Sequence, residues 1–289
     1  MAILPPLWFS VLASFAGTQD SAPAPSDPKA EGCWSSFLAA SGSRKETPPI
    51  TAFHLRADIV TREGVQTNEL RTEYRFLAPD SIRFLLSSGR EIGRSGPKQR
   101  DYWLKDKDEI VPLVGADHER DRRDVDRMLA VARNFVGLSD PAKLHIERCE
   151  ILDAPPSDIG PDRLRDAKEL RWLCVTSPDF ALVPEAAQGV PAERALYRVE
   201  LALMDSYVPR FVIVRQEPAS DPASRSNSML LELDLHQERD GYRIPLSIKV
   251  HALDPAASPA IFAARPAQDI WIEEIDLRPA FTALDFKPR

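Results

Sequence analysis

The chain has 289 residues, of which 43% are hydrophobic and 28% are charged, as is usual for a folded soluble protein. This length is enough for one large all-β domain or for two small domains. The formal net charge is -7 and no basic stripe stands out, which argues against nucleic acid as a partner. Proline is frequent, at 26 residues, and glycine is scarce, at 12. Prolines that recur along the chain are typical of turns between strands rather than of helices.

The chain begins with a short apolar run. Residues 1–16 are too few to cross a membrane, which takes about 20, and Ser14 and Ala16 offer a small-x-small cleavage site. We therefore predict a signal peptide and a periplasmic or otherwise exported protein, soluble once the peptide is removed. The alternative, an N-terminus that is disordered or docks on the core, stays open. Residues 17–30 are predicted to be a flexible linker, and residues 31–289 a single β domain.

The first predicted elements are a short helix and a block of strands. Residues 33–40 are typical of a helix with Trp34, Phe37 and Leu38 as its apolar stripe. In residues 52–63 (AFHLRADIVTRE) apolar and polar residues alternate with the period of a half-buried strand. Further strands of the same block are predicted at residues 69–78, 81–87, 100–104 and 109–114.

A change of period then marks the one long helix of the sequence. Residues 117–138 carry apolar residues at helical spacing, opposite a face rich in arginine and aspartate. Gly137 indicates the end of the helix, and Pro141 follows shortly after it. The apolar stripe consists of Val125, Met128, Leu129, Ala132, Phe135 and Val136. We expect this stripe to pack on a sheet, either as ordinary core or as a lid over a lipid-sized cavity.

Strands resume after this helix and continue almost to the end of the chain. Residues 239–241 (RDG) are typical of a tight hairpin turn between two of them. The predicted strands are residues 144–152, 168–176, 195–204, 208–216, 229–235, 242–252 and 269–277. The fold class is therefore mainly β: a single antiparallel curved sheet or half-open barrel of about ten or more strands, covered by the central amphipathic helix and the short N-terminal helix.

The chain contains three cysteines, Cys33, Cys149 and Cys174. Cys149 and Cys174 lie in neighbouring predicted strands, so a hairpin would bring them close, and an exported chain could oxidise them to a disulfide. Two buried free thiols fit the sequence equally well, because cross-strand disulfide geometry is demanding. No Cys-x-x-Cys motif is present, which argues against zinc fingers and thioredoxin-type sites.

The sequence contains no motif of catalytic chemistry. The five histidines show no metal-binding spacing, and no nucleophile elbow, P-loop or dinucleotide fingerprint occurs. Asp117, His118 and Glu119 are adjacent, but they open a highly charged helix and are typical of its solvated first turn. Residues 89–96 (GREIGRSG) would suit an anion, but a hairpin turn is the stronger interpretation. We therefore predict no catalytic residue, no metal, no cofactor and no enzymatic activity.

Three stretches of the chain share a pattern with a known superfamily. In residues 53–114 amphipathic strands lead through LAPDSIRF to YWL at residues 102–104. The helix at residues 121–138 follows that meander, and the C-terminal stretch, residues 270–288, ends in IDLRPAFTALDFKP. In this order of elements the chain resembles the periplasmic lipoprotein-carrier superfamily of LolA-like and LolB-like outer-membrane lipoprotein-sorting proteins.

The resemblance implies a half-open antiparallel barrel whose concave face holds the acyl chains of a lipid or lipoprotein. It also implies an envelope membrane donor or acceptor protein as partner, with the chain itself a monomer. Extra segments at residues 154–164 and 220–228 depart from the simplest carriers, so no cargo-handling residue is carried over. Our candidates for the lining of an acyl cavity are Leu55, Ile59, Tyr74, Phe84, Val125, Met128, Leu129, Phe135, Leu201, Leu233, Ile248 and Ile272.

Two other functions fit the same sequence. An envelope scaffold or interaction protein would use the same sheet with a filled core, because the same residues line a core and an apolar pocket. A hydrolase would need an active site assembled from distant loops, and it is the weaker alternative because no motif indicates one.

Overall fold

The computed structural model describes most of the chain after its first 26 residues. The described parts are residues 27–42, 47–63, 66–86, 88–138, 146–177, 196–217, 228–254, 257 and 259–288. The predicted signal peptide and most of the predicted linker therefore lie outside the described residues. Within the described ranges, no helix is both long and apolar enough to span a bilayer.

Two strand meanders make up most of the sheet. The first consists of β1 (Ala52–Glu63), β2 (Gln66–Leu77), β3 (Ser81–Leu86), β4 (Glu91–Arg94), β5 (Tyr102–Asp106) and β6 (Glu109–Pro112). The second consists of β7 (Arg148–Leu152), β8 (Arg171–Ser177), β9 (Leu196–Leu203), β10 (Pro209–Glu217), β11 (Met229–Arg239) and β12 (Tyr242–Asp254). Two further strands, β13 (Ile261–Phe262) and β14 (Gln268–Asp276), follow β12.

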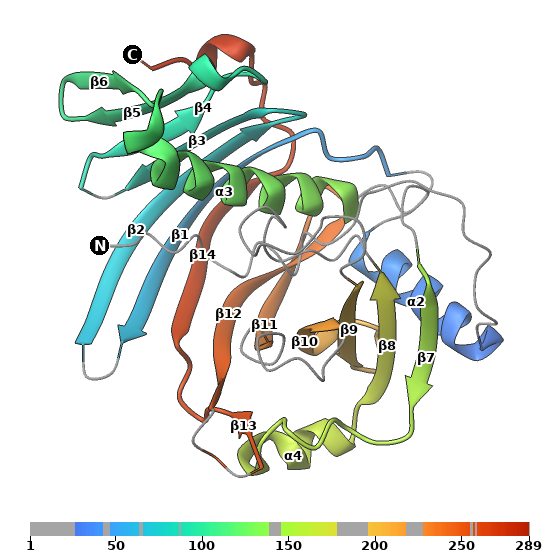
Figure 1. Cartoon of the computed structure of the whole chain (residues 1–289). Helices are drawn as coiled ribbons and strands as arrows, with labels where there is room; N and C mark the ends of the chain where they lie inside the picture. The colour runs from blue at the N-terminus through green and yellow to red at the C-terminus, as the bar shows by residue number, and fades with distance from the viewer. Residues whose placement is uncertain are drawn as a thin grey trace.

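These fourteen strands form one antiparallel sheet. The chain lays down β1 to β6 toward one edge, crosses to the opposite edge at β7 and returns strand by strand to β12. Strand β14 then fits between β12 and β1, while β13 pairs with β12 off the main path. The edge strands β6 and β7 do not pair with each other, so the sheet curves without closing into a barrel (Figure 1). The predicted fold class, a curved and open antiparallel sheet, is confirmed.

Helix α3 (Glu119–Leu138) makes the crossing between the two meanders, close to the helix predicted at residues 117–138. It follows a 3-10 turn, η2 (Ala116–His118), and lies across the concave, inner face of the sheet, in contact with β3 and β4 (Figure 1). A connection that runs over an apolar sheet face has to satisfy its own backbone hydrogen bonds, and a helix does so internally.

Helix α2 (Pro28–Ser41) covers the other end of the inner face, against β7, β8 and β12. It begins earlier than the predicted helix, because the Asp27 side chain accepts a hydrogen bond from the Lys29 N–H at 2.9 Å and caps the first turn. The last three residues predicted as linker thus belong to this helix. Gly42 ends it with a φ of +99°, and a Cβ atom there would lie 2.2 Å from the Gly241 carbonyl oxygen.

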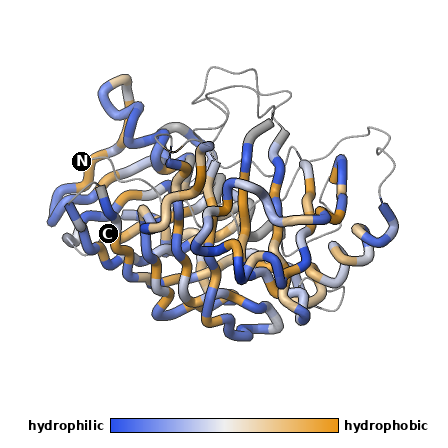
Figure 2. Tube along the Cα trace, turned by 90° about the horizontal axis from the view of Figure 1, so that it is seen from below, coloured by the Kyte–Doolittle hydropathy of each residue, from blue (hydrophilic) through white to orange (hydrophobic). Residues whose placement is uncertain are grey.

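The inner face of the sheet forms one large hydrophobic core with α2 and α3. Along the strands, alternate residues point inward and are buried, which Figure 2 shows as an alternation of hydrophobic and hydrophilic colours. Phe53 and Phe76 of the first meander and Leu201 and Leu233 of the second belong to the same cluster. One continuous apolar surface therefore extends from β5 to β7.

A second, smaller hydrophobic cluster covers the outer face of the second meander. Helix α4 (Pro161–Lys168), between β7 and β8, packs there, and Trp172 of β8 donates its indole N–H to the Ala167 carbonyl at 2.8 Å. The two strands pair with each other as expected, but a helix rather than a tight turn connects them. Helix α4 was not predicted from the sequence, because its eight residues are mostly polar and only Arg163 and Ala167 are buried.

The C-terminal segment covers the outer face of the first meander. It contains a 3-10 turn, η6 (Ala283–Phe286), whose Phe286 side chain is fully buried. Trp103 of β5 donates its indole N–H to the Phe286 carbonyl at 3.0 Å, and Arg83 of β3 donates to the Asp285 carbonyl at 3.3 Å. The end of the chain thus shields the Trp103 ring on this outer face from solvent.

The disulfide considered for Cys149 and Cys174 is contradicted by the strand register. Cys149 of β7 pairs with Val175, and Cys174 of β8 pairs with Glu150, so the two side chains point to opposite faces of the sheet. Cys149 belongs to the inner core, and Cys33, Cys149 and Cys174 are all buried thiols outside any disulfide. Burial raises the pKa of the Cys149 thiol to about 12, which keeps it protonated and unreactive.

His236 of β11 is half-buried, and this loss of solvent lowers the pKa of its imidazole to about 4. Asp234 opposes the shift, while Arg243 and Arg210 add to it. An unfolded histidine titrates near 6.5. Between pH 6.5 and pH 4 the unfolded chain therefore takes up a proton that the folded chain does not, and the free energy of unfolding falls as the pH falls through this window.

The substitution His236→Gln should remove this part of the acid sensitivity. We expect the free energy of unfolding of the wild type to fall by about 1 kcal/mol more than that of the variant between pH 7 and pH 5, after allowance for solvent screening. Urea unfolding of both proteins at the two pH values measures the difference. Equal losses in the two proteins would contradict the assignment to His236.

Candidate ligand site beneath helix α3

Four residues of α3 pack its apolar side onto the sheet. Val125, Met128, Leu129 and Ala132 recur at intervals of one, three and four, so they share one side of the helix, and all four are buried. They join the inner core cluster, as the apolar spacing predicts. The side chain of Phe135, also predicted for this stripe, lies outside the described part of the chain.

Polar contacts tie the first half of α3 to the sheet. Asp126 accepts a hydrogen bond from the Tyr102 hydroxyl, and an Nη1 atom of Arg94 lies 3.5 Å from the Asp126 Oδ1. The Arg94 guanidinium also lies over the Tyr102 ring, 4.8 Å from its centroid. Arg122 donates to two carbonyl oxygens of the segment before the helix, at 3.0 and 2.6 Å. These contacts hold α3 over the first meander.

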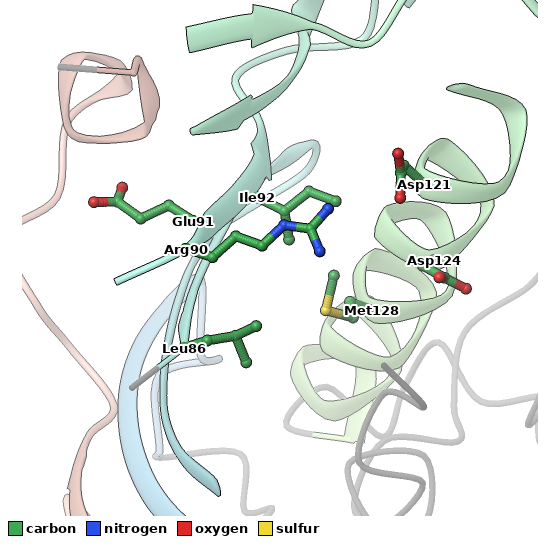
Figure 3. A pocket seen from close by; sticks show the side chains of 7 residues that line it. All are labelled: Leu86, Arg90, Glu91, Ile92, Asp121, Asp124 and Met128. Carbon is green, nitrogen blue, oxygen red and sulfur yellow. The ribbon is translucent and has the colours of Figure 1, made fainter. Parts of the chain in front are cut away.

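A small cavity lies between this half of α3 and the β3–β4 hairpin (Figure 3). Its volume is about 20 Å³, which is room for one water molecule or one oxygen-sized group. Arg90 extends from the hairpin toward α3, and Met128 extends from α3 toward the hairpin (Figure 3). The residues that line the cavity are Leu86, Arg90, Glu91, Ile92, Asp121, Asp124 and Met128.

Arg90 differs from the other charged groups of this lining. Its Nε is buried, and none of the described residues accepts a hydrogen bond from it. Glu91 points to the other side of the strand (Figure 3), where it pairs with the Arg83 guanidinium. Asp121, on the helix, lies 3.8 Å from the Nδ1 of His118. A buried donor without an acceptor costs about 1–3 kcal/mol, so an oxygen atom bound beside Arg90 would be stabilised.

Most of the predicted lining residues lie in the inner core of the sheet. Eleven of the twelve are buried members of the inner core cluster, namely Leu55, Ile59, Tyr74, Phe84, Val125, Met128, Leu129, Leu201, Leu233, Ile248 and Ile272. The twelfth, Phe135, has no described side chain. Met128 also lines the cavity beneath α3. That these residues contact a ligand stays a prediction, because a filled core would bury them in the same way.

Sequence reasoning did not select the charged residues of the cavity. The stretch at residues 89–96 suggested both a hairpin turn and an anion site, but it contains a strand that was not predicted, β4, which pairs with β3, so only the residues before Glu91 form the turn. The sequence therefore placed Arg90, which follows Gly89, in a candidate anion site. Its approach to α3 could not be read from the sequence, because the helix comes later in the chain and folds back over the hairpin.

The described residues offer binding chemistry rather than a metal centre. Across the described ranges, no group of three His, Cys, Asp or Glu side chains could hold a metal ion. The adjacent Asp117, His118 and Glu119 lie where η2 meets α3, and Glu119 pairs with Arg123 at 3.1 Å, as in a solvated first turn. The cavity beneath α3 combines an apolar wall with Arg90 and Asp121, which suits an amphiphile with charged groups.

Comparison with known proteins gives matches in structure only. No protein-family model matches the chain, and no curated protein matches it in sequence. A LolA superfamily protein from Nitrosomonas europaea is similar with 12% identity and a TM-score of 0.45, over 88% of this chain and 97% of that one. A domain from Vibrio parahaemolyticus named for outer membrane lipoprotein sorting has 8% identity and a TM-score of 0.43, with the same coverage.

A third solved structure is similar to the same extent. A DUF1329 family protein from Desulfovibrio piger has 8% identity and a TM-score of 0.45, over 89% of this chain and 97% of that one. The first two of these structures bear the names of the superfamily that the sequence resembles. With TM-scores below 0.5, the three alignments carry no argument about what this chain binds.

Proposed function

We propose that this chain is an exported, non-enzymatic carrier or binder of lipid or lipoprotein acyl chains. The observation that supports this most is the continuous apolar inner face, which extends across both meanders. Helices cover its two ends, α3 against β3 and β4, and α2 against β7 and β8. An acyl chain laid along this face would leave water for apolar side chains at a gain of about 0.8 kcal/mol per methylene.

In this proposal the cargo enters when α3 moves away from the sheet. The helix is a crossing connection, and among its described side chains Arg122 and Asp126 make polar contacts in its first half. The helix would turn about these contacts, so that its second half lifts from the inner face. For an acyl chain to enter beneath α3 between the described residues, the helix would have to move, because the cavity there holds only about 20 Å³.

The protein would work in the periplasm or another envelope compartment. Residues 1–16 would direct its export and be removed. As a monomer with an enclosed acyl chain, the protein would stay soluble while it takes cargo from a membrane or donor protein and delivers it to an acceptor. These partners follow from the carrier role, because a lipid held in water has to be loaded and released.

An envelope scaffold with a filled core is the second candidate function. The small size of the cavity beneath α3 favours it, since ligand pockets usually enclose about 300–1,000 Å³. In that case the inner face would serve only to hold the fold together, and the outer surface would bind a partner protein.

Native mass spectrometry tests the carrier proposal. The full chain would be purified from an envelope extract without detergent and then extracted with organic solvent. A bound mass in the lipid range that denaturation releases would support the carrier. A clean apo mass, with no uptake of an added fluorescent fatty-acyl probe, would contradict it and favour the scaffold.

The substitution Ala132→Phe separates the two functions further. Ala132 is buried on the side of α3 that faces the sheet, so a phenyl ring there would occupy the space of an acyl chain. A carrier should lose the fatty-acyl probe that the wild type takes up, whereas a scaffold should take up no probe before or after the change, and overpacking of the closed core should cost about 1–3 kcal/mol in either case. Ala116→Phe, at an exposed position just before α3, is the matched control and should change neither property.

A further inference from the structure

We propose that the cavity between α3 and the β3–β4 hairpin binds the head of a zwitterionic amphiphile, with Arg90 on a phosphate oxygen and Asp121 on a neighbouring primary ammonium. This inference rests on the proposed function and names the class of lipid that the carrier would prefer. Three features of the cavity support this inference: the buried N–H donor of Arg90, the charged side chains that line the cavity and its apolar wall.

Arg90 supplies the site for the anionic part of the head. Its Nε is buried without an acceptor among the described residues, and its side chain extends toward α3 (Figure 3). A guanidinium presents paired N–H donors that match the oxygen atoms of a phosphate. The enclosed part of the cavity has room for one such oxygen, while the rest of the head would remain at its opening.

Asp121 makes a lone anion a poor ligand. This residue lines the cavity from the first turn of α3, whereas the Asp124 side chain points away from Arg90 (Figure 3). A free phosphate would be repelled by the Asp121 carboxylate at short range. An ammonium group next to the phosphate, as in phosphoethanolamine, places a positive charge near Asp121 and complements both Arg90 and Asp121.

The apolar residues of the cavity connect the head to the acyl path. Leu86, Ile92 and Met128 line the cavity and also belong to the inner core cluster. A lipid whose phosphate is held by Arg90 would therefore have the start of its acyl chain on the inner face of the sheet. The head group would lie beside the polar contacts of α3, at the end of the helix that stays in place.

Two lysophospholipids with the same acyl chain test this inference. Lysophosphatidylethanolamine carries a phosphate and an ammonium, whereas lysophosphatidylglycerol carries the phosphate alone. Native mass spectrometry of the full chain with each lipid in turn gives the two affinities. We expect the wild type to bind the ethanolamine lipid about tenfold more tightly, because a charge-assisted hydrogen bond is gained only with that head.

Single substitutions assign the charges of the site. Arg90→Gln should weaken both lipids about tenfold, because both use the phosphate. Asp121→Asn should weaken the ethanolamine lipid alone, and so reduce the preference. Arg120→Gln, at an exposed position on the same helix, is the matched control and should leave both affinities unchanged. Thermal unfolding of each variant, measured in parallel, shows whether a loss of binding is a loss of fold.

The outcomes separate this inference from the proposed function. Equal binding of the two lipids by the wild type would overturn the inference and leave the carrier standing. Binding of neither lipid would overturn both. Free phosphoethanolamine, added without an acyl chain, distinguishes a lipid head from a soluble ligand: an affinity equal to that of the lipid would support the head site and overturn the carrier.

Discussion

Gly93→Ala is expected to lower the free energy of unfolding by about 3 kcal/mol. Gly93 lies in β4, and a Cβ atom there would stand 2.6 Å from the Ile82 carbonyl oxygen and 2.7 Å from Cζ2 of the Trp103 indole. The carbonyl belongs to the backbone of the paired strand β3, so relief of the clash requires the two strands to move apart. Urea unfolding of the variant and the wild type measures the loss.

Gly32→Ala in α2 is the matched control for this substitution. No heavy atom lies within 4 Å of a Cβ atom built at Gly32, and alanine is a better helix former than glycine. The control should therefore gain about 0.5–1 kcal/mol. If Gly93→Ala were as stable as the wild type, the close approach of Trp103 to β4 would not be part of the fold in solution.

Arg163→Ala is expected to cost about 3–5 kcal/mol. The Arg163 side chain is buried, and it joins α4 to the segment around β13 on the outer face of the sheet. Alanine would leave several buried acceptors without a donor, each at about 1–3 kcal/mol before relaxation. Arg163 contacts the carbonyl oxygens of Ile159, Phe262, Ala263 and Ala264 and the imidazole of His251, and its Nε lies 3.8 Å from the Glu232 carboxylate.

Arg165→Ala is the matched control, because it removes the same side chain from an exposed position of the same helix. Its free energy of unfolding should stay within about 0.5 kcal/mol of the wild type. Equal losses for the two variants would show that the loss of an arginine from α4, rather than the buried hydrogen bonds of Arg163, sets the stability of this region.

The strands could be predicted from the sequence wherever one face of the sheet is buried. Residues 52–63 alternate with period two, and this pattern identifies β1 without knowledge of its partners. The turn at residues 239–241 was equally clear, and it joins β11 to β12 through Asp240 and Gly241, with φ of +51° and +84°. Aspartate and glycine tolerate this left-handed conformation, so the turn signal is local.

The candidate site could be predicted only in part. Eleven of the proposed lining residues lie in the inner core, because apolar spacing determines which side of a strand or helix is buried. Arg90, Asp121 and Asp124 could not be placed together, since the hairpin and the helix that hold them are separate segments and their contact has no sequence pattern. Helix α4 was missed for a similar reason, as its burial depends on Arg163, a residue type that is usually exposed.

The sequence by itself determined that the chain forms an open β-sheet with one amphipathic helix between two blocks of strands, and which apolar residues face inward. Only the tertiary structure decided that Cys149 and Cys174 point to opposite faces, that α4 covers the outer face, and that Arg90 meets α3. The physical reason is that periodicity is a local property of the chain. Register and contacts between elements depend on how distant segments pair, and a shift of one residue reverses every side chain of a strand.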